Sequence, residues 1–197
     1  ALYQVVKIFK VGSQLFTLAG PEIVEYIKKK NAEVFLDLKF HDIPNTVANA
    51  VRSALSLEVK MLTLHASGGD EMMCAAVKAA TEGSASMKVK KPLLIGVTVL
   101  TSQEALPADV LALAQKAVDR GLDGVVCSVR EAGLLRQNIK KDFIIVTPGI
   151  RPDSAAPDDQ KRTATVSDAK AAGSDFIVVG RPIIEAPDPL KAAKEFI

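Results

Sequence analysis

The sequence has only two cysteines and two histidines among its 197 residues. Cys74 and Cys127 lie far apart and lack the spacing of metal ligands, and no cysteine–histidine cluster accompanies them. A transition-metal site is therefore not expected. We interpret both cysteines as buried thiols of a protein in a reducing compartment. No signal peptide is apparent either.

Long apolar runs and basic runs are also lacking. No apolar stretch reaches the roughly 20 residues of a membrane-spanning helix, so we expect no membrane segment. The formal net charge is only +2, without a stripe of lysine and arginine, so a nucleic-acid partner is not expected. The composition is 48% hydrophobic and 24% charged, as in soluble globular proteins. The length suits one domain, which we predict over residues 1–197.

Short β-rich segments alternate with helical segments along the whole chain. The strands are predicted at 5–11, 33–40, 60–66, 92–100, 123–128, 142–148 and 175–181. The helices are predicted at 21–30, 45–57, 70–81, 107–120, 130–138, 165–172 and 188–197. Strict alternation indicates an α/β fold whose parallel strands are joined by helical crossovers.

The number of predicted strands points to a barrel with one strand missing. A doubly wound sheet usually has about five or six strands, and a (β/α)8 TIM barrel has eight. Seven predicted units fit a barrel whose first strand, with its helix, lies upstream of Ala1. We therefore predict a TIM barrel that is incomplete at its N-terminus.

The segment 33–40 places charge inside this barrel. Its even-numbered residues, from Val34 to Phe40, are all apolar, whereas Asp37 and Lys39 belong to the odd-numbered set. Successive side chains of a strand point to opposite faces. The apolar set suits the interface with the outer helices. Asp37 and Lys39 then point inward near the carboxyl end of the strand, where barrel enzymes build their active sites.

Asp37 and Lys39 belong with Asp42 to the pattern D-x-K-x-x-D in DLKFHDIPNT. Lys10 ends the preceding predicted strand, so we expect it to lie laterally beside Asp37. Buried charges of opposite sign have to be paired. A structural salt bridge at the barrel mouth would satisfy this need, and Lys10 alone could be a surface lysine. Convergence at a strand end favours a ligand site instead.

A second candidate site lies at the last two predicted strands. A polar loop with glycine and proline follows strand 142–148, and strand 175–181 ends in Gly180 and Arg181. The loops after the last two strands are the usual phosphate site of these barrels. Glycine lets backbone N–H groups approach a phosphate, and arginine offers a planar fork to its oxygens. A surface salt bridge is the alternative role for Arg181.

Six motifs carry a family resemblance. In chain order they are FKVG, DLKFHDIPNT, HASGG, VTVLTS, TPGIRP and VVGRPI. From about Lys10 to Pro189, the sequence resembles the orotidine 5′-monophosphate decarboxylase family of the bacterial type. DLKFHDIPNT is its most diagnostic piece, since phosphosugar decarboxylases and aldolase-like barrels share D-x-K-x-x-D.

The resemblance implies decarboxylation of orotidine 5′-monophosphate to uridine 5′-monophosphate without a metal or organic cofactor, the last step of de novo pyrimidine biosynthesis. It implies that Lys10, Asp37 and Lys39 act in one subunit, with Lys39 stabilising and protonating the C6 carbanion. Asp42 would reach the partner's site in a homodimer. A further aspartate would lie in the first strand, upstream of Ala1. The pathway also implies a cytoplasmic location.

The substrate contacts follow from the same resemblance. Gln160 and Arg181 would hold the phosphate, with Gly180 supplying its backbone. Ser102 would hydrogen-bond the pyrimidine, and Thr46 would lie near the ribose, although both could equally be helix caps as bare sequence. For His65 and His41, which the family does not use for proton transfer, we expect structural roles.

Two alternatives stay open on sequence alone. The first is an Mg²⁺-dependent phosphosugar decarboxylase or synthase of the same superfamily, which shares D-x-K-x-x-D but not HDIPNT and VLTS. The second is a non-catalytic nucleotide-binding barrel. Every charged residue expected within the chain is present, which disfavours the second.

Overall fold

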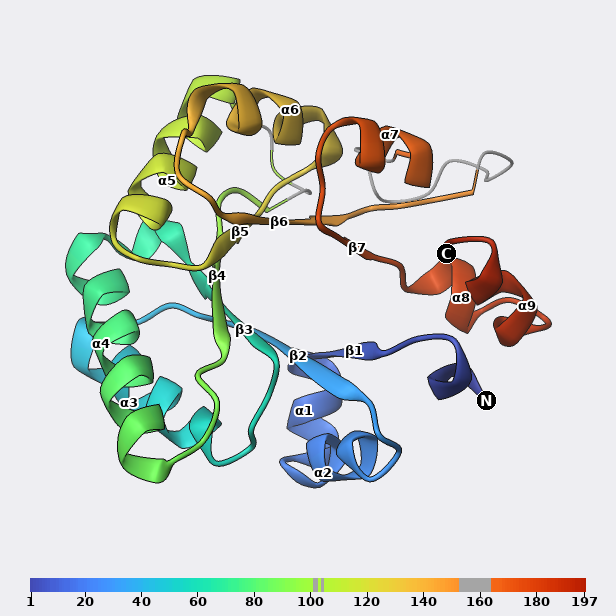
Figure 1. The fold of residues 1–197 in the computed structure, drawn as a ribbon, viewed down its shortest axis with the longest axis horizontal. Helices are drawn as coiled ribbons and strands as arrows, with labels where there is room; N and C mark the ends of the chain where they lie inside the picture. Colours follow the sequence, from blue (N-terminus) through green and yellow to red (C-terminus); the bar gives the residue numbers. More distant parts are fainter. Residues whose placement is uncertain (101–102, 104, 153–163) are drawn as a thin grey trace.

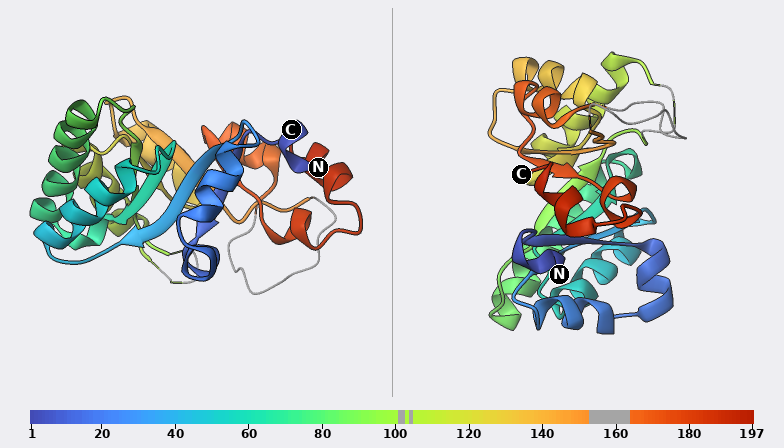
Figure 2. Two further views of the ribbon diagram at one scale, coloured as in Figure 1. Left: turned by 90° about the horizontal axis from the view of Figure 1, so that it is seen from below. Right: turned by 90° about the vertical axis from the view of Figure 1, so that its right-hand side faces the viewer.

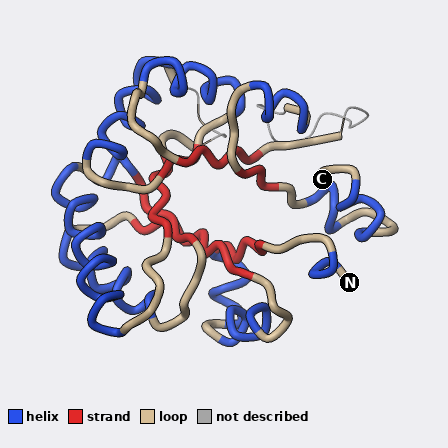
Figure 3. Tube along the Cα trace, in the orientation of Figure 1, coloured by secondary structure: helices blue, strands red, loops and turns tan. Residues whose placement is uncertain are grey.

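The computed structural model describes residues 1–100, 103, 105–152 and 164–197. In these residues seven parallel strands form one sheet in chain order. They are β1 (Ile8–Gly12), β2 (Glu33–Phe40), β3 (Met61–His65), β4 (Leu93–Val97), β5 (Gly124–Val126), β6 (Ile144–Pro148) and β7 (Phe176–Val178). The sheet curls into a nearly closed barrel (Figures 1 and 3). The predicted parallel barrel and all seven strand positions are confirmed, and every strand except β2 is shorter than predicted.

Most of the helices cover the outer face of this sheet, and the last two lie beside the opening of the barrel (Figures 1 and 3). The helices are α1 (Ser13–Ala19), α2 (Glu22–Lys28), α3 (Pro44–Leu55), α4 (Asp70–Met87), α5 (Pro107–Asp119), α6 (Val129–Asn138), α7 (Val166–Ala171), α8 (Arg181–Ile184) and α9 (Pro189–Lys194). Two 3₁₀ turns, η1 (Leu2–Gln4) and η2 (Ala66–Gly68), complete the described elements. The sequence patterns missed α1 and α8, and the four residues of α8 are too few to show a helical period. Arg181 accordingly begins a helix instead of ending a strand.

Two apolar layers follow the alternation of side chains along the strands. Val34 and Leu36 pack with the outer helices in the largest core cluster. Phe35 packs instead inside the barrel, against Met61, Ile95 and other inward residues of neighbouring strands. The predicted assignment of the two faces of segment 33–40 is therefore confirmed. This assignment turns Asp37 and Lys39 toward the interior.

The described part of the barrel is open between β7 and β1, since no pairing between these two strands occurs among the described residues. On this side η1 contacts α9 (Figures 1 and 2). Buried Ile183 and Phe196 form a separate cluster there with partly buried residues of the first segment, such as Leu2 and Val6. The eighth strand expected upstream of Ala1 stays a prediction.

The two cysteines differ in environment. Cys127 is buried, and its burial raises the pKa of the thiol far above the ordinary range. Cys74 is exposed on α4, so the prediction of two buried thiols was wrong for this residue. The next residues of α4 are partly buried Ala75 and buried Ala76. The core-facing side of the helix therefore lies next to Cys74 and does not include it. No helix in the described ranges is long and apolar enough to cross a membrane.

Candidate active site

A cavity of about 730 Å³ runs from the carboxyl ends of the strands into the barrel interior. Its floor is apolar and includes Phe35, Val126 and Val146. Its charged residues come from the ends of β1 and β2 and from the segments that follow β6 and β7. Polar groups converging on an apolar cavity at this end of a barrel are the usual arrangement of an active site.

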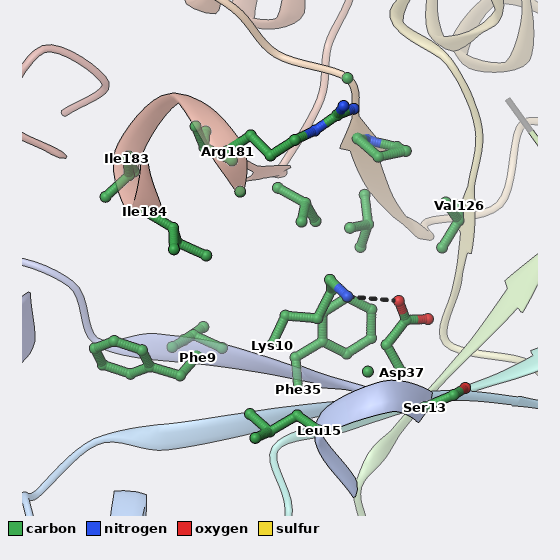
Figure 4. A pocket seen from close by; sticks show the side chains of 18 of the residues that line it. Phe9, Lys10, Ser13, Leu15, Phe35, Asp37, Val126, Arg181, Ile183 and Ile184 are labelled. Atoms are coloured by element: carbon green, nitrogen blue, oxygen red, sulfur yellow. Dashed lines mark ion pairs between the residues drawn. The ribbon is translucent and has the colours of Figure 1, made fainter. Parts of the chain in front are cut away.

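One wall of the cavity carries three charged side chains in contact, Lys10, Asp37 and Lys39, which we call the charged array. The Oδ2 atom of Asp37 lies 2.8 Å from Lys39 Nζ and 3.1 Å from Lys10 Nζ. Figure 4 shows Lys10 reaching Asp37 from the neighbouring strand. The Asp37 side chain is only 10% exposed, whereas the side chains of Lys10 and Lys39 are 37% and 34% exposed. The anion is thus buried between two cations that a ligand can reach.

The electrostatics of the array keep Asp37 ionised. Burial alone would raise its pKa, but the hydrogen bond from Lys39 and the charges of Lys10 and Lys39 outweigh burial and hold the pKa below its ordinary value. One buried negative charge therefore faces two ammonium groups. The array carries a net positive charge toward the cavity, which suits it to a negatively charged reacting group.

Lys39 occupies a strained backbone conformation. Its φ is +52°, in the left-handed region that non-glycine residues rarely adopt, at a cost of about 1–3 kcal/mol. The pairing of β2 with β3 shifts at this point, since Leu36 pairs with Leu62 but Phe40 pairs with Leu64. This bulge sets two extra residues of β2 against β3, so Lys39 stays on the same face as Asp37. Both Asp37 and Lys39 line the cavity.

Thr63 on β3 supports the array and was missed by sequence reasoning. It is completely buried. Its hydroxyl accepts a hydrogen bond from the backbone N–H of Lys39 at 2.9 Å and donates one to Asp37 Oδ1 at 3.0 Å. The sequence contains one signal for this role, because Thr63 is the only polar residue in the apolar run MLTL of the predicted strand 60–66.

Asp42 and Thr46 lie away from this cavity, in the described structure of the single chain. Both are exposed, and neither lines the cavity. Asp42 accepts a hydrogen bond from the N–H of Ile43, which is the N-cap of α3. Thr46 is the third residue of that helix and does not cap it. The structure therefore does not bring these two predicted residues to the charged array of their own subunit.

The predicted phosphate site lies across the cavity from the array. Gly180 and Arg181 both line the cavity, and Arg181 extends into it from the first turn of α8 (Figure 4). A Cβ atom on Gly180 would meet nothing within 4 Å, so its backbone is open to a ligand. Arg151, which follows β6, also lines the cavity and was not identified from the sequence. Ser102 and Gln160 lie outside the described residues.

The two histidines stack beside the array. Their ring centroids lie 5.0 Å apart with a tilt of 31°. Partial burial, followed by the charges of His41 and Lys39, lowers the pKa of His65 below its ordinary value. His65 is therefore neutral at physiological pH and adds no charge to the array.

The described residues contain no group of three or more histidine, cysteine, aspartate or glutamate side chains placed to hold a metal ion. Asp37 is the carboxylate that lines the cavity at the array, and two ammonium groups already contact it. A divalent cation there would have to displace both ammonium groups. The donor set therefore fits an anionic organic ligand better than a metal.

Comparisons with known proteins agree with this geometry. A family model described as "Orotidine 5'-phosphate decarboxylase / HUMPS family" matches residues 1–196. A curated orotidine 5′-phosphate decarboxylase of Syntrophotalea carbinolica is 50% identical over 203 aligned positions, which cover 98% of this chain and 83% of the relative. The corresponding protein of Hydrogenovibrio crunogenus is 50% identical, with 94% and 81% of the two chains covered.

Solved structures extend this similarity to the fold. The crystal structure of orotidine 5′-phosphate decarboxylase from Lactobacillus acidophilus superposes with a TM-score of 0.81 at 39% identity, covering 95% of this chain and 85% of that one. The enzyme of Thermotoga maritima superposes with a TM-score of 0.74 at 29% identity, with the same coverage. The family match over nearly the whole chain and the relatives at half identity lead to one conclusion: this chain belongs to the orotidine 5′-phosphate decarboxylase family.

Proposed function

We propose that this protein decarboxylates orotidine 5′-monophosphate to uridine 5′-monophosphate, the last step of de novo pyrimidine biosynthesis. The observation that carries the proposal is the charged array of Lys10, Asp37 and Lys39 on one wall of the cavity, with Arg181 on the other side. Orotidine 5′-monophosphate has one charged group at each end of the molecule, the carboxylate on the base and the phosphate. The two charged regions of the cavity match these two ends.

The chemical difficulty of the reaction is the electron pair left on C6. When the bond from C6 to the carboxylate breaks, CO2 departs and C6 becomes a carbanion without a conjugated sink. A cation placed where this charge develops stabilises the transition state. Lys39 supplies that cation, and its ammonium group then donates a proton to C6 as the general acid.

Asp37 and Lys10 prepare Lys39 for these two steps. The carboxylate of Asp37, 2.8 Å from Lys39 Nζ, stabilises the ammonium form that has to donate the proton. Lys10 contacts the same Oδ2 atom at 3.1 Å and holds the carboxylate in place. It would also contact the ribose. The exposed faces of both ammonium groups are directed to the substrate.

The phosphate would bind at the opposite end of the cavity. Gly180 offers backbone groups and Arg181 a guanidinium, with Gln160 as a further ligand implied by the family pattern. These contacts are remote from C6. Their binding energy can therefore be used to position the base against the array.

Asp42 and Thr46 would act in the site of a second subunit, as the family pattern implies. Both are exposed and lie outside the cavity of their own chain, as a shared site in a homodimer requires. The test mixes two inactive variants, Asp42→Ala and Lys39→Ala, under conditions that allow subunit exchange. A heterodimer would regain one intact site, so activity should reappear. Mixtures that stay inactive although heterodimers form would refute the shared site.

A cytoplasmic location would accompany this pathway, as would a lack of dependence on metals. The first experiment is a spectrophotometric assay with orotidine 5′-monophosphate on protein pretreated with EDTA. Rapid loss of substrate absorbance is the expected result. No turnover, with Mg²⁺-dependent activity on a sugar phosphate, would assign the protein to the phosphosugar decarboxylases instead. Uridine 5′-monophosphate binding without turnover in either assay would favour a non-catalytic barrel.

A further inference from the structure

Thr63 contacts the charged array from the neighbouring strand β3. It is completely buried on β3 and does not line the cavity, so it does not touch a substrate. A buried hydroxyl without partners would be unfavourable, yet Thr63 is placed in the middle of a hydrophobic strand. Its two hydrogen bonds both go to residues of the array.

The direction of these hydrogen bonds is determined by the donors. The N–H of Lys39 can only donate, so the Thr63 oxygen accepts from it at 2.9 Å. The ionised Asp37 can only accept, so the hydroxyl proton points to Asp37 Oδ1 at 3.0 Å. Asp37 Oδ1 is therefore held by Thr63, while Oδ2 receives both ammonium groups. The Thr63 hydroxyl therefore accepts one hydrogen bond and donates one, and the direction of neither bond can be reversed.

The hydroxyl of Thr63 also lies opposite the bulge of β2. Because Leu36 pairs with Leu62 and Phe40 with Leu64, the segment 37–39 lies opposite Thr63 alone. Lys39 takes its φ of +52° within this segment. Its N–H is directed to the side chain of Thr63 instead of to a backbone carbonyl of β3. Thr63 thus stabilises the backbone conformation that presents Lys39 to the cavity.

We infer that Thr63 is a positioning residue that holds Asp37 and Lys39 together in the catalytic arrangement. The inference rests on the proposed function. It assigns to Thr63 no contact with the substrate and no proton transfer. Its hydroxyl fixes the rotation of the Asp37 carboxylate and the backbone of Lys39 at once. Removing the hydroxyl should therefore misplace the proton donor while leaving the phosphate end of the cavity intact.

The decisive variants are Thr63→Val, which keeps the shape and removes the hydroxyl, and Thr63→Ser, which keeps the hydroxyl and removes a methyl group. For Thr63→Val we expect kcat to fall about a hundredfold, with KM changed less than about threefold, because misplacement of a reacting group by about 1 Å costs this much. Thr63→Ser should stay within about threefold of the wild type. Thr147→Val is the matched control, since Thr147 is equally buried and its hydroxyl donates to Ser174.

A residue with only a packing role would give the opposite pattern. Thr63→Ser would then be impaired through the lost methyl group, and Thr63→Val would retain its kcat. Either result would overturn the inference, as would a loss of kcat in Thr147→Val equal to that in Thr63→Val. If Thr63→Val does not fold, Thr63→Ser alone decides, because a hundredfold loss with the hydroxyl present contradicts positioning.

A crystal structure of Thr63→Val separates this inference from the proposed function. The inference expects the contact between Asp37 and Lys39 to lengthen beyond 4 Å or φ of Lys39 to leave the left-handed region. An unchanged array would overturn it, whatever the substrate. Wild-type protein that fails to decarboxylate orotidine 5′-monophosphate would overturn the proposed function alone.

Discussion

Gly12 leaves the space that the ammonium group of Lys10 occupies: a Cβ atom on Gly12 would lie 3.1 Å from Lys10 Nζ. In the pairing of β1 with β2, Lys10 is opposite Phe35 and Gly12 is opposite Asp37. Lys10 therefore leans along its own strand, over Gly12, to contact the carboxylate two pairs further on. A side chain at position 12 would press against the ammonium group that makes this contact.

Gly12→Ala should consequently weaken catalysis without unfolding the protein. The Lys10 ammonium has to move by a few tenths of an ångström, so we expect kcat/KM to fall roughly threefold to tenfold. Gly12→Val should cause a larger loss. Steady-state kinetics and thermal unfolding measure the two effects separately. Gly133→Ala is the control, because a Cβ there meets nothing within 4 Å. Wild-type kinetics for Gly12→Val would show that the position of Lys10 does not matter.

Lys39→Ala should abolish decarboxylation while leaving nucleotide binding measurable. The variant loses both the cation beside C6 and the proton donor, so we expect kcat to fall by about a thousandfold or more. Binding of uridine 5′-monophosphate, measured by calorimetry, should persist because the phosphate end is untouched. Lys60→Ala is a matched control, since Lys60 makes a comparable ion pair with Glu33 at 3.0 Å at the opposite end of the strands. Substantial turnover by Lys39→Ala would exclude Lys39 as the proton donor.

The architecture could be predicted from the sequence because the strands carry strong local signals. The strands are rich in β-branched and apolar residues, and the alternation within 33–40 correctly separates inward Phe35 from outward Val34 and Leu36. The helix α8 was missed because its four residues complete only about one turn, which is too short for a periodic pattern. The helix α1 was missed although it is no shorter than α2, α7 and α9, which were predicted.

The support of the array could not be predicted in the same way. Strand periodicity places Asp37 and Lys39 on one face, but the bulge and the positive φ of Lys39 depend on pairing with Thr63 on another strand. The same holds for the space above Gly12, which only the register between β1 and β2 reveals. The proposed role of Asp42 would involve a second subunit, which the strand pattern of one chain does not encode.

Arg181→Ala should lower kcat/KM for orotidine 5′-monophosphate by about a hundredfold, because charge-assisted contacts to the phosphate are lost. Turnover of orotidine, which lacks the phosphate, should be slow and nearly equal in the variant and the wild type. Arg52→Ala is the control, since Arg52 contacts Asn49 on the surface of α3. A similar loss with both substrates would show that Arg181 acts on the fold and not on the phosphate.

His65 should make the protein less stable in mildly acidic solution. Burial and the nearby charges of His41 and Lys39 lower its pKa in the folded state below the ordinary 6.5. As the pH falls below 6.5, the unfolded chain therefore takes up a proton at His65 that the folded chain does not, and the free energy of unfolding decreases. The decrease should be modest because His65 is only half-buried.

Urea unfolding at about pH 7.5 and about pH 5.5, on either side of the ordinary histidine pKa, measures the decrease in the free energy of unfolding. His65→Gln removes the titrating ring and should lose less stability between the two pH values than the wild type. His41→Gln keeps His65 but removes one of the neighbours that lower the pKa of His65. The stability that His41→Gln loses between the two pH values should therefore lie between the losses of His65→Gln and the wild type. Equal losses for His65→Gln and the wild type would mean that other groups cause the acid sensitivity. A smaller loss of stability for the wild type than for His65→Gln would mean that His65 is charged in the folded protein, beside Lys39.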